Sequence, residues 1–482
     1  MSDPNLDKEK GRAFPTTVPP TPAPYETTTF RQRLRDTEWS KRWGWNLYVT
    51  AMGTGAVMVC VHSIPYEFQG QFAMATLFFF LDILDFIICT TMTVIRAIKH
   101  PLVFKHSFYD QTEAPWLPTF NLTIATILTG MINLGIPNTG DWLIVALEVL
   151  FWIYILLGAC TALILQNTFR LLPRPLHLIG PVECLECFPL MLAGSIGSML
   201  CVHVNRISPE RALTILLFAI ICQGLGFWMS LIKLSSWMLH HIVLPRAPSK
   251  TLPSYMIAAG APGFTALALV KIGNASLEIF PDNELLAGQG IDPTLAAQVF
   301  AVVGHWFGLL CVGMYVWIVM IFLGWGLLRI VDMIQHGYLG KYELSLWAFS
   351  FPLSGAIACW GEWARFFPSK AFGILNIIGT VFVFLMWLFN SIGTLTLLYN
   401  GILPGVPKEF VPSELNTAYN STDDLTGLDL DGIRYQSNDD IEMGEGRGGE
   451  ERGDPDNYNS RLSTAVNSLN GDAATSRMRG RV

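Results

Sequence analysis

Long apolar runs, separated by short polar connections, fill the chain between residues 43 and 403. Ten of these runs are long enough to cross about 30 Å of hydrocarbon as a helix. The pattern therefore predicts an all-α polytopic membrane protein with ten transmembrane helices. The predicted spans are Trp43–Val61, Phe72–Ala97, Leu117–Leu134, Trp142–Leu165, Pro181–Val204, Ala212–Leu239, Tyr255–Leu277, Phe300–Leu328, Leu344–Ala364 and Phe372–Tyr399.

Polar segments flank this region on both sides. Residues 1–42 are rich in proline and polar side chains, whereas residues 404–482 contain 15 acidic and 8 basic residues. The resulting charge of −7 equals the formal charge of the whole chain, so the acidity belongs to the tail. Neither segment has enough large apolar residues to form a core. We expect a cytosolic, largely disordered N-terminal segment (1–42), a transporter or channel domain (43–403) and a disordered, acidic cytosolic tail (404–482).

Lysine and arginine are distributed unevenly between the two sides of the predicted spans. They cluster before the first span and in the connections that follow even-numbered spans. The opposite connections carry only Arg206, Arg211, Arg365 and Lys370. By the positive-inside rule, both termini are cytosolic and every odd-numbered span runs from the cytosol outwards.

Composition agrees with a membrane protein and gives no sign of an enzyme. The chain is 51% hydrophobic and only 14% charged, which is too apolar for an ordinary soluble core. Cys184 and Cys187 have C-x-x-C spacing but lack a second pair or a histidine partner, so we expect no metal site there. Motifs such as H-E-x-x-H, G-x-S-x-G or a P-loop do not occur. We therefore expect no catalytic residues, no cofactor, and no nucleic-acid partner for this bilayer protein.

Prolines distinguish the odd-numbered spans from the even-numbered ones. Pro189, Pro262 and Pro352 each fall well inside an odd-numbered span, whereas the interiors of the even-numbered spans contain none. A proline removes a backbone hydrogen bond and kinks the helix, which membrane proteins tolerate where the freed carbonyls face protein or a wet cavity. We therefore expect kinked odd spans that line an interior path. The alternative is that prolines and small residues only permit close helix packing.

Related local sequences recur in the odd-numbered spans. CFPLMLAGSIGS, GAPGFTALAL and SFPLSGAIAC each place small residues after a proline, and AMGTGAV in the first span has two glycines instead. Their spacing predicts five helical-hairpin repeats around a central pore lined by the odd spans. The candidate pore residues in these segments are Gly53, Thr54, Gly55, Phe188, Pro189, Pro262, Gly263, Phe264, Pro352 and Ser354.

Six motifs carry a resemblance to a known family: MGTG, NTGDW, QGLGFW, APGFTALAL, FPLSG and PSKAFG. In this order, between residues 40 and 400, they resemble those of fungal malic acid transport proteins. These proteins belong to the tellurite-resistance/dicarboxylate transporter family, together with sulfite efflux pumps and plant slow anion channels. The resemblance implies a fold of ten helices in five hairpins, a central pore and the transport of anions.

The resemblance also implies roles for residues of the ninth span. In similar anion channels a phenylalanine of this helix plugs the pore, and the motif match places that role on Phe351. Ordinary packing is the alternative for this residue. The family glutamate of the same helix corresponds to Glu362, for which we favour a structural ion pair with Arg365 over a substrate contact.

One departure from the family pattern concerns a positive charge in the seventh span. Where the malate-permease pattern reads N-I-A-R, this chain reads KIGN, from Lys271 to Asn274. A shift of three positions keeps the charge on a similar face of the helix. A dicarboxylate needs positive charge to compensate its carboxylates, so Lys271 is our candidate for neutralising the substrate. Lys233 in the sixth span is the rival.

Together these features predict a plasma-membrane carrier or channel for organic acid anions, with malate and related C4-dicarboxylates as the first expectation. Sulfite efflux is the alternative within the transport class, and a membrane receptor or scaffold that uses the acidic tail is the alternative outside it. Relatives suggest a homotrimer. The tail is expected either to regulate transport as a kinase substrate or to be a solvated extension with no role.

Overall fold

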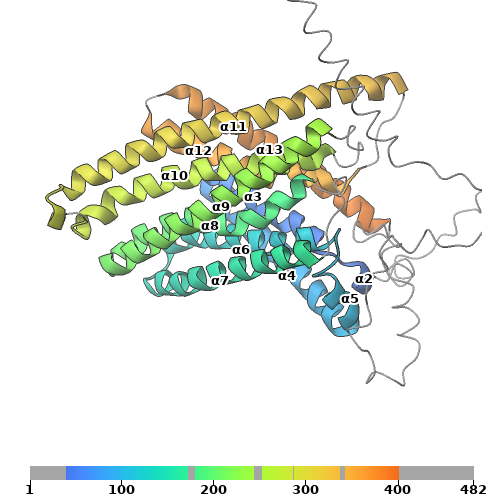
Figure 1. The fold of residues 1–482 in the computed structure, drawn as a ribbon, viewed down its shortest axis with the longest axis horizontal. Coiled ribbons are helices and arrows are strands. Elements are labelled where there is room, and N and C mark those ends of the chain that lie inside the picture. The colour runs from blue at the N-terminus through green and yellow to red at the C-terminus, as the bar shows by residue number, and fades with distance from the viewer. Residues whose placement is uncertain are drawn as a thin grey trace, which may run out of the picture. The chain divides into compact units, whose positions relative to one another are not determined.

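The computed structural model describes residues 39–171, 180–243, 252–285, 287–336, 342–367 and 369–400. Most of the predicted N-terminal segment and the predicted acidic tail lie outside these ranges. Every regular element of the described residues is helical (Figure 1), and nine helical segments are long and apolar enough to cross a membrane. The prediction of an all-α polytopic membrane protein is therefore confirmed. The first predicted span consists of the shorter elements η1 (Trp45–Tyr48) and α3 (Val49–Ser63), so the count of ten stays a prediction.

Five helices form an inner ring. Around the ring, α3 contacts α6, α6 contacts α8, α8 contacts α10, α10 contacts α12, and α12 contacts α3 again. These helices correspond to the five odd-numbered predicted spans. Besides α3, they are α6 (Pro118–Gly130), α8 (Phe188–Asn205), α10 (Ile257–Asp282) and α12 (Phe351–Phe366).

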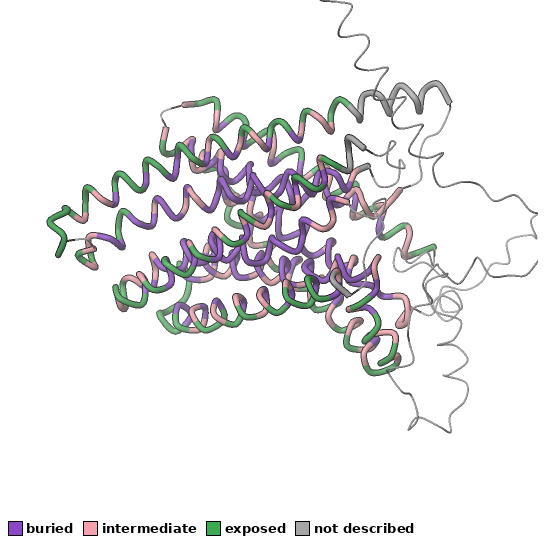
Figure 2. The backbone as a smooth tube through the Cα atoms, viewed as in Figure 1, coloured by how far each residue is buried: buried purple, intermediate pink, exposed green. Residues whose placement is uncertain are grey.

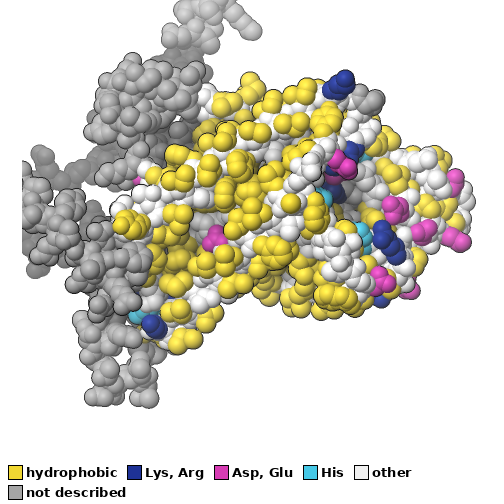
Figure 3. Space-filling model, turned by 180° about the vertical axis from the view of Figure 1, so that it is seen from behind, with side chains coloured by type: hydrophobic (Ala, Val, Ile, Leu, Met, Phe, Trp, Pro, Cys, Tyr) yellow, Lys and Arg dark blue, Asp and Glu magenta, His cyan; other side chains and the backbone are white. Residues whose placement is uncertain are grey.

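The other five long helices pack around the outside of this ring. They contain 22–39% buried residues in their most apolar stretches, against 67–89% in α6, α8, α10 and α12, so they face the lipid (Figure 2). Figure 3 shows hydrophobic side chains over one face of the bundle, with most of its charged side chains gathered toward one end. The outer helices are α4 (Gln71–Lys99), α7 (Trp142–Leu171), α9 (Pro209–Val243), α11 (Pro293–His336) and α13 (Lys370–Tyr399).

Short helical turns precede the α-helices of the ring. The 3₁₀-helices η2 (Ala114–Trp116), η6 (Pro181–Cys187), η7 (Leu252–Met256) and η9 (Leu344–Phe349) lead into α6, α8, α10 and α12, respectively. The α6 helix continues into a π-helical turn, η3 (Met131–Gly135), and a 3₁₀ turn, η4 (Ile136–Asn138).

The expectation that prolines kink continuous helices is wrong for two of the three. Pro189 and Pro352 lie in the first turn of α8 and α12, directly after a 3₁₀ segment, and only Pro262 lies inside its helix. Proline is well tolerated in a first turn because its missing N–H would have no helical partner there. Pro189 and Pro352 therefore mark the change from 3₁₀-helix to α-helix within the first half of these two inner spans.

The first and last described segments of the chain pack together at one end of the bundle. Trp43, Trp45 and Tyr48 form a buried aromatic cluster against which Leu398, near the end of α13, also packs. Arg96 of α4 donates from Nη1 to the carbonyl of Trp43 at 2.8 Å and forms a bidentate ion pair with Glu113. The short helices α2 (Trp39–Arg42) and α5 (Pro101–His106) belong to this same end (Figure 1).

Gly361 allows a close approach between α12 and α3. A Cβ atom at this position would overlap the carbonyl oxygen of Ser63 and lie 3.2 Å from its carbon. The same Cβ would lie 3.0 Å from Nδ2 of Asn376 in α13, which donates to the Ser63 hydroxyl at 2.9 Å and to the Ile357 carbonyl at 2.7 Å, so the backbone has no room to shift.

Gly361→Ala is accordingly expected to destabilise the protein by about 1–3 kcal/mol, the usual cost of overpacking. Thermal unfolding of the purified protein in detergent would measure this loss. Gly313 of α11 is the matched control, because a Cβ there would meet nothing within 4 Å. Equal unfolding temperatures for the Gly361→Ala and Gly313→Ala variants would contradict the close approach.

Candidate functional site

A cavity of about 70 Å³ lies inside the ring, and all five inner helices line it. This volume holds several water molecules. Its wall includes Val59 and Ser63 of α3, Thr126 of α6, Leu192 of α8 and Ala358 of α12. Each outer helix is therefore separated from the cavity by a layer of inner helices.

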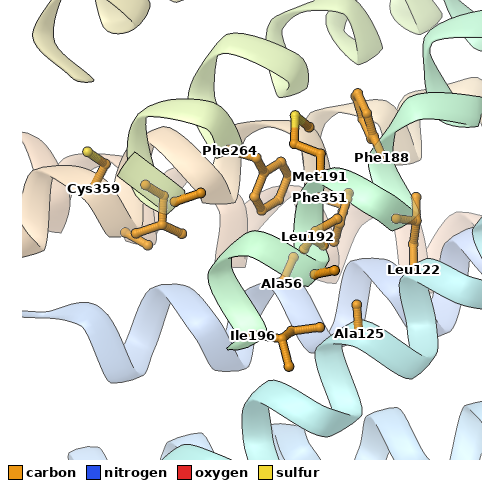
Figure 4. Packing of buried hydrophobic residues seen from close by; sticks show 14 of the residues in the cluster. Ala56, Leu122, Ala125, Phe188, Met191, Leu192, Ile196, Phe264, Phe351 and Cys359 are labelled. Atoms are coloured by element: carbon orange, nitrogen blue, oxygen red, sulfur yellow. The ribbon is translucent and has the colours of Figure 1, made fainter. Parts of the chain in front are cut away.

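Two phenylalanines from two inner helices bound the cavity at one end, and a third packs against them from α8. Phe351 and Phe264 line it directly, with ring centroids 4.8 Å apart, and Phe188 lies 6.3 Å from Phe264 (Figure 4). Phe351 is only 1% exposed and begins α12 immediately before Pro352. A ring at the junction between a 3₁₀ segment and an α-helix can change its position when the junction changes its backbone angles.

Three charged side chains lie toward the other end of the cavity. Lys271 of α10 donates from Nζ to Oε1 of Glu362 at 2.8 Å, and Arg365 donates from Nη1 to the same oxygen at 3.4 Å. Arg365 also reaches the backbone carbonyls of Ser63 and Ile64 at 3.5 and 3.4 Å. All three charged side chains line the cavity, and two cations with one carboxylate leave a net charge of about +1 there.

Helix geometry separates these two ends of the cavity. Lys271 follows Phe264 by seven residues in α10, so a rise of about 1.5 Å per residue places it about 10 Å from the phenylalanine layer. Glu362 follows Phe351 by eleven residues in α12, which corresponds to about 16 Å. An anion that enters at the charged end therefore passes polar wall residues before it reaches the phenylalanines.

Hydroxyl and amide side chains supply that polar wall. Ser354 donates to the Phe351 carbonyl at 2.7 Å, and Thr126 donates to Oδ2 of Asp82 at 2.7 Å. Ser195 of α8 is 4% exposed, and its hydroxyl has no hydrogen-bond partner among the described residues. Thr129 and Asn133 complete the wall, and His62 adds an imidazole.

The structure brings some of the predicted site residues together in the cavity. Phe351, Lys271, Phe264 and Ser354 line it, and so do both members of the predicted ion pair, Glu362 and Arg365. Glu362 also pairs with Lys271, 91 residues away in the chain, a contact that no sequence motif indicated. Five further lining residues were not predicted, although Ser195 lies within the small-residue segment that follows Pro189: Ser195, Thr126, Thr129, Asn133 and His62.

The other predicted residues lie at contacts between helices. A Cβ on Gly53 would lie 2.5 Å from the Trp347 ring, and one on Gly55 would overlap Asp82 and Thr126. Thr54 accepts a hydrogen bond from Nε1 of Trp387 in α13 at 2.9 Å.

The remaining candidates on α8, α10 and α12 also lie between helices. The Pro189 carbonyl accepts a hydrogen bond from the Tyr154 hydroxyl at 2.8 Å. A Cβ on Gly263 would lie 3.1 Å from the Ala356 nitrogen, and one on Gly260 would lie 2.9 Å from the Phe188 ring and 3.2 Å from Pro352. Phe188, Pro189, Pro262, Gly263 and Pro352 are thus absent from the lining of the described cavity.

Lys233, the rival cation, lies on an outer helix. Its Nζ is 3.1 Å from Oε2 of Glu186 and 3.9 Å from Oε2 of Glu183, and it lies over the Phe169 ring. Oδ1 of Asn274, the position where the motif resemblance leads us to expect a positive charge, accepts a 3.0 Å hydrogen bond from Nε2 of His305 on α11. Neither Lys233 nor Asn274 lines the described cavity, so Lys271 is the lysine that reaches it.

Taken together, the fold and the cavity define a polytopic membrane protein with a positively charged central cavity that phenylalanines bound at one end. The family model described as SLAC1, voltage-dependent anion channel, matches residues 42–395. This match spans most of the chain, and the chain belongs to that family. The resemblance predicted from its motifs is thereby confirmed.

Characterised and uncharacterised relatives cover most of the same region. The chain is 25% identical over 354 residues to the malic acid transport protein of Schizosaccharomyces pombe. The matched region covers 72% of this chain and 76% of that protein. It is 22% identical over 349 residues to the sulfite efflux pump SSU1 of Arthroderma benhamiae, with coverage of 71% and 87%. An uncharacterized transporter of Methanocaldococcus jannaschii is 23% identical over 369 residues, with coverage of 74% and 95%.

Proposed function

We propose that this protein transports organic acid anions, with malate and related C4-dicarboxylates as its substrates, through the central cavity. The observation that carries the proposal is the cavity itself: a ring of five helices encloses a net positive charge at one end and phenylalanines at the other. Positive charge inside a membrane protein is costly unless it is paired or serves an ion pathway. Membership of an anion-channel family and the malic acid transport relative support the same reading.

In the proposed mechanism, the positive end attracts the anion and Phe351 controls its passage. A carboxylate enters the cavity, contacts Lys271 and Arg365, and exchanges water for the hydroxyls of the wall. In this mechanism the Phe351 ring, packed on Phe264, closes the path. Movement of the ring away from Phe264 opens it, and the junction beside Pro352 supplies the hinge.

The proposal places the protein in the plasma membrane as a homotrimer with both termini in the cytosol. The distribution of lysine and arginine around the spans supports this orientation, which makes the charged end of the cavity extracellular. The acidic tail, 404–482, lies outside the described residues. Its phosphorylation by a kinase is proposed as a means of regulating transport.

Sulfite efflux is the second candidate function, and the similarity to a sulfite efflux pump favours it. Purified protein in liposomes would decide between the two. Uptake of labelled malate that excess malate inhibits, and that sulfite inhibits only weakly, is the expected result. Inhibition mainly by sulfite would support the second function, and no flux of either anion would favour a receptor or scaffold.

A further inference from the structure

We infer that the Glu362 carboxylate is a resident anion: it occupies the site in which Lys271 and Arg365 bind the transported anion, and that anion must displace it. The inference rests on the proposed function and identifies the group with which the substrate competes. It differs from the structural ion pair expected from the sequence, in which Glu362 and Arg365 only stabilise the end of α12.

The three charged side chains share one hydrogen-bond acceptor. A single carboxylate oxygen, Oε1 of Glu362, accepts from both Lys271 at 2.8 Å and Arg365 at 3.4 Å. The side chains are 25%, 17% and 47% exposed for Lys271, Glu362 and Arg365, respectively, and all three line the cavity. The pair therefore faces the space through which the anion is proposed to pass.

Glu362 and the proposed substrate carry the same chemical group. A carboxylate of malate would offer an ammonium and a guanidinium the same charge and the same oxygen acceptors that Glu362 offers them. In the proposed displacement, the substrate carboxylate takes over the two contacts that Oε1 of Glu362 makes with Lys271 and Arg365, and Glu362 is released. With Glu362 in place the two cations leave a net charge of about +1, whereas without it they supply +2, which matches a dicarboxylate dianion.

The same cavity contains a hydroxyl donor without a hydrogen-bond partner among the described residues. The Ser195 hydroxyl is buried, lines the cavity and has no partner among the described residues. A buried hydroxyl without a hydrogen bond is costly, so an acceptor at this position would be stabilising. Ser195 follows Phe188 by seven residues, as Lys271 follows Phe264, which places both about 10 Å from the phenylalanine layer on the adjacent helices α8 and α10.

These features together describe a two-point site. One carboxylate of the substrate takes the place of Glu362 at Lys271 and Arg365, and a second polar group of the same molecule accepts from Ser195. Glu362 does not supply that second contact, because the Ser195 hydroxyl has no hydrogen-bond partner among the described residues. A C4-dicarboxylate therefore gains a hydrogen bond that the resident carboxylate lacks, which is how it can displace a tethered competitor.

The test is the malate affinity of the Glu362→Gln variant of the full-length protein, measured by binding of labelled malate in detergent. Removal of the competing charge should lower the Kd for malate at least about tenfold, which corresponds to about 1.4 kcal/mol. The Kd for chloride should fall less, because a monovalent ion gains less from one added positive charge. A purely structural pair would instead give an unchanged or higher Kd for malate, and that result would overturn the inference.

Two further variants make the result specific. Glu148 also pairs with an arginine, Arg211, but on the outer helices α7 and α9, so Glu148→Gln should leave the Kd for malate unchanged. The double variant Lys271→Gln with Glu362→Gln should lose the gain in affinity. Equal gains in the single and double variants would contradict a competition at Lys271.

A milder change covers the case in which Glu362→Gln does not fold. Glu362→Asp keeps the charge but shortens its reach to Lys271, so the Kd for malate should fall about threefold, which corresponds to about 0.7 kcal/mol. An unchanged Kd in this folded variant would also overturn the inference. If the wild-type protein transports malate while both Glu362 variants bind it unchanged, only the resident anion is wrong; if the wild type neither binds nor transports malate, the proposed function fails.

Discussion

Lys271→Gln is expected to reduce malate transport in proteoliposomes by about tenfold to a hundredfold. The substitution leaves Arg365 and Glu362 as a balanced pair, so the charged end of the cavity becomes neutral. Hydrogen bonds to charged groups contribute about 1.5–3 kcal/mol, and the loss of one such contact accounts for a change of this size. Lys271→Arg keeps the positive charge and should retain part of the activity.

Lys233→Gln is the matched control for this experiment. Lys233 is also a partly buried lysine in an ion pair, but it binds Glu186 on the outside of the ring. Its loss should affect stability more than transport. Wild-type affinity and rate in the Lys271→Gln variant would contradict a role in binding, and the anion would then be held by hydroxyls such as Ser354 and by helix dipoles.

Phe351→Ala is expected to make the pathway leaky, with an increase of about tenfold or more in anion efflux from liposomes. The ring is buried and fills the space against Phe264, so its removal enlarges the cavity toward the η9 side of the ring. Loss of a buried phenylalanine also costs about 3–5 kcal/mol of stability. The flux is therefore to be compared among variants with the same amount of folded protein.

Phe151→Ala is the matched control that distinguishes a gate from an ordinary packing residue. Phe151 of α7 is fully buried like Phe351, but it packs against Gly197 and does not line the described cavity. The Phe151→Ala protein should be less stable, but its anion efflux should stay at the wild-type level. Wild-type efflux in a folded Phe351→Ala protein would show that Phe351 is a packing residue.

The ring of inner helices was largely predictable from the sequence. In a bilayer every backbone group must find its partner locally, so long apolar runs form helices whatever their neighbours are. Small residues and prolines recur in the odd-numbered spans because the ring requires close approaches, such as that of Gly53 to Trp347 or of Gly361 to Ser63. Their periodic placement therefore indicated which helices lie inside.

The change of helix type at Pro189 and Pro352 could not be predicted in the same way. A proline is compatible both with a kink inside a helix and with a place in the first turn of a new one. Which of the two occurs depends on whether the preceding segment is held as a 3₁₀-helix. Contacts such as that of Nε1 of Trp347 with the Thr394 hydroxyl at 3.0 Å decide this, and they join segments that are distant in sequence.

The sequence by itself determined the all-α membrane fold, the inner position of the odd spans, the family, and a short list that included Phe351 and Lys271. Hydropathy, small-residue spacing and local motifs encode these features, because each depends on neighbours within one helix. Only the tertiary structure decided that Lys271 and Arg365 share one oxygen of Glu362, that Ser195 faces the cavity without a partner, and that Thr54 and Gly55 do not line it. These facts depend on the rotation of each helix about its own axis. Packing against helices that are distant in sequence sets this rotation, so it cannot be predicted from a single segment.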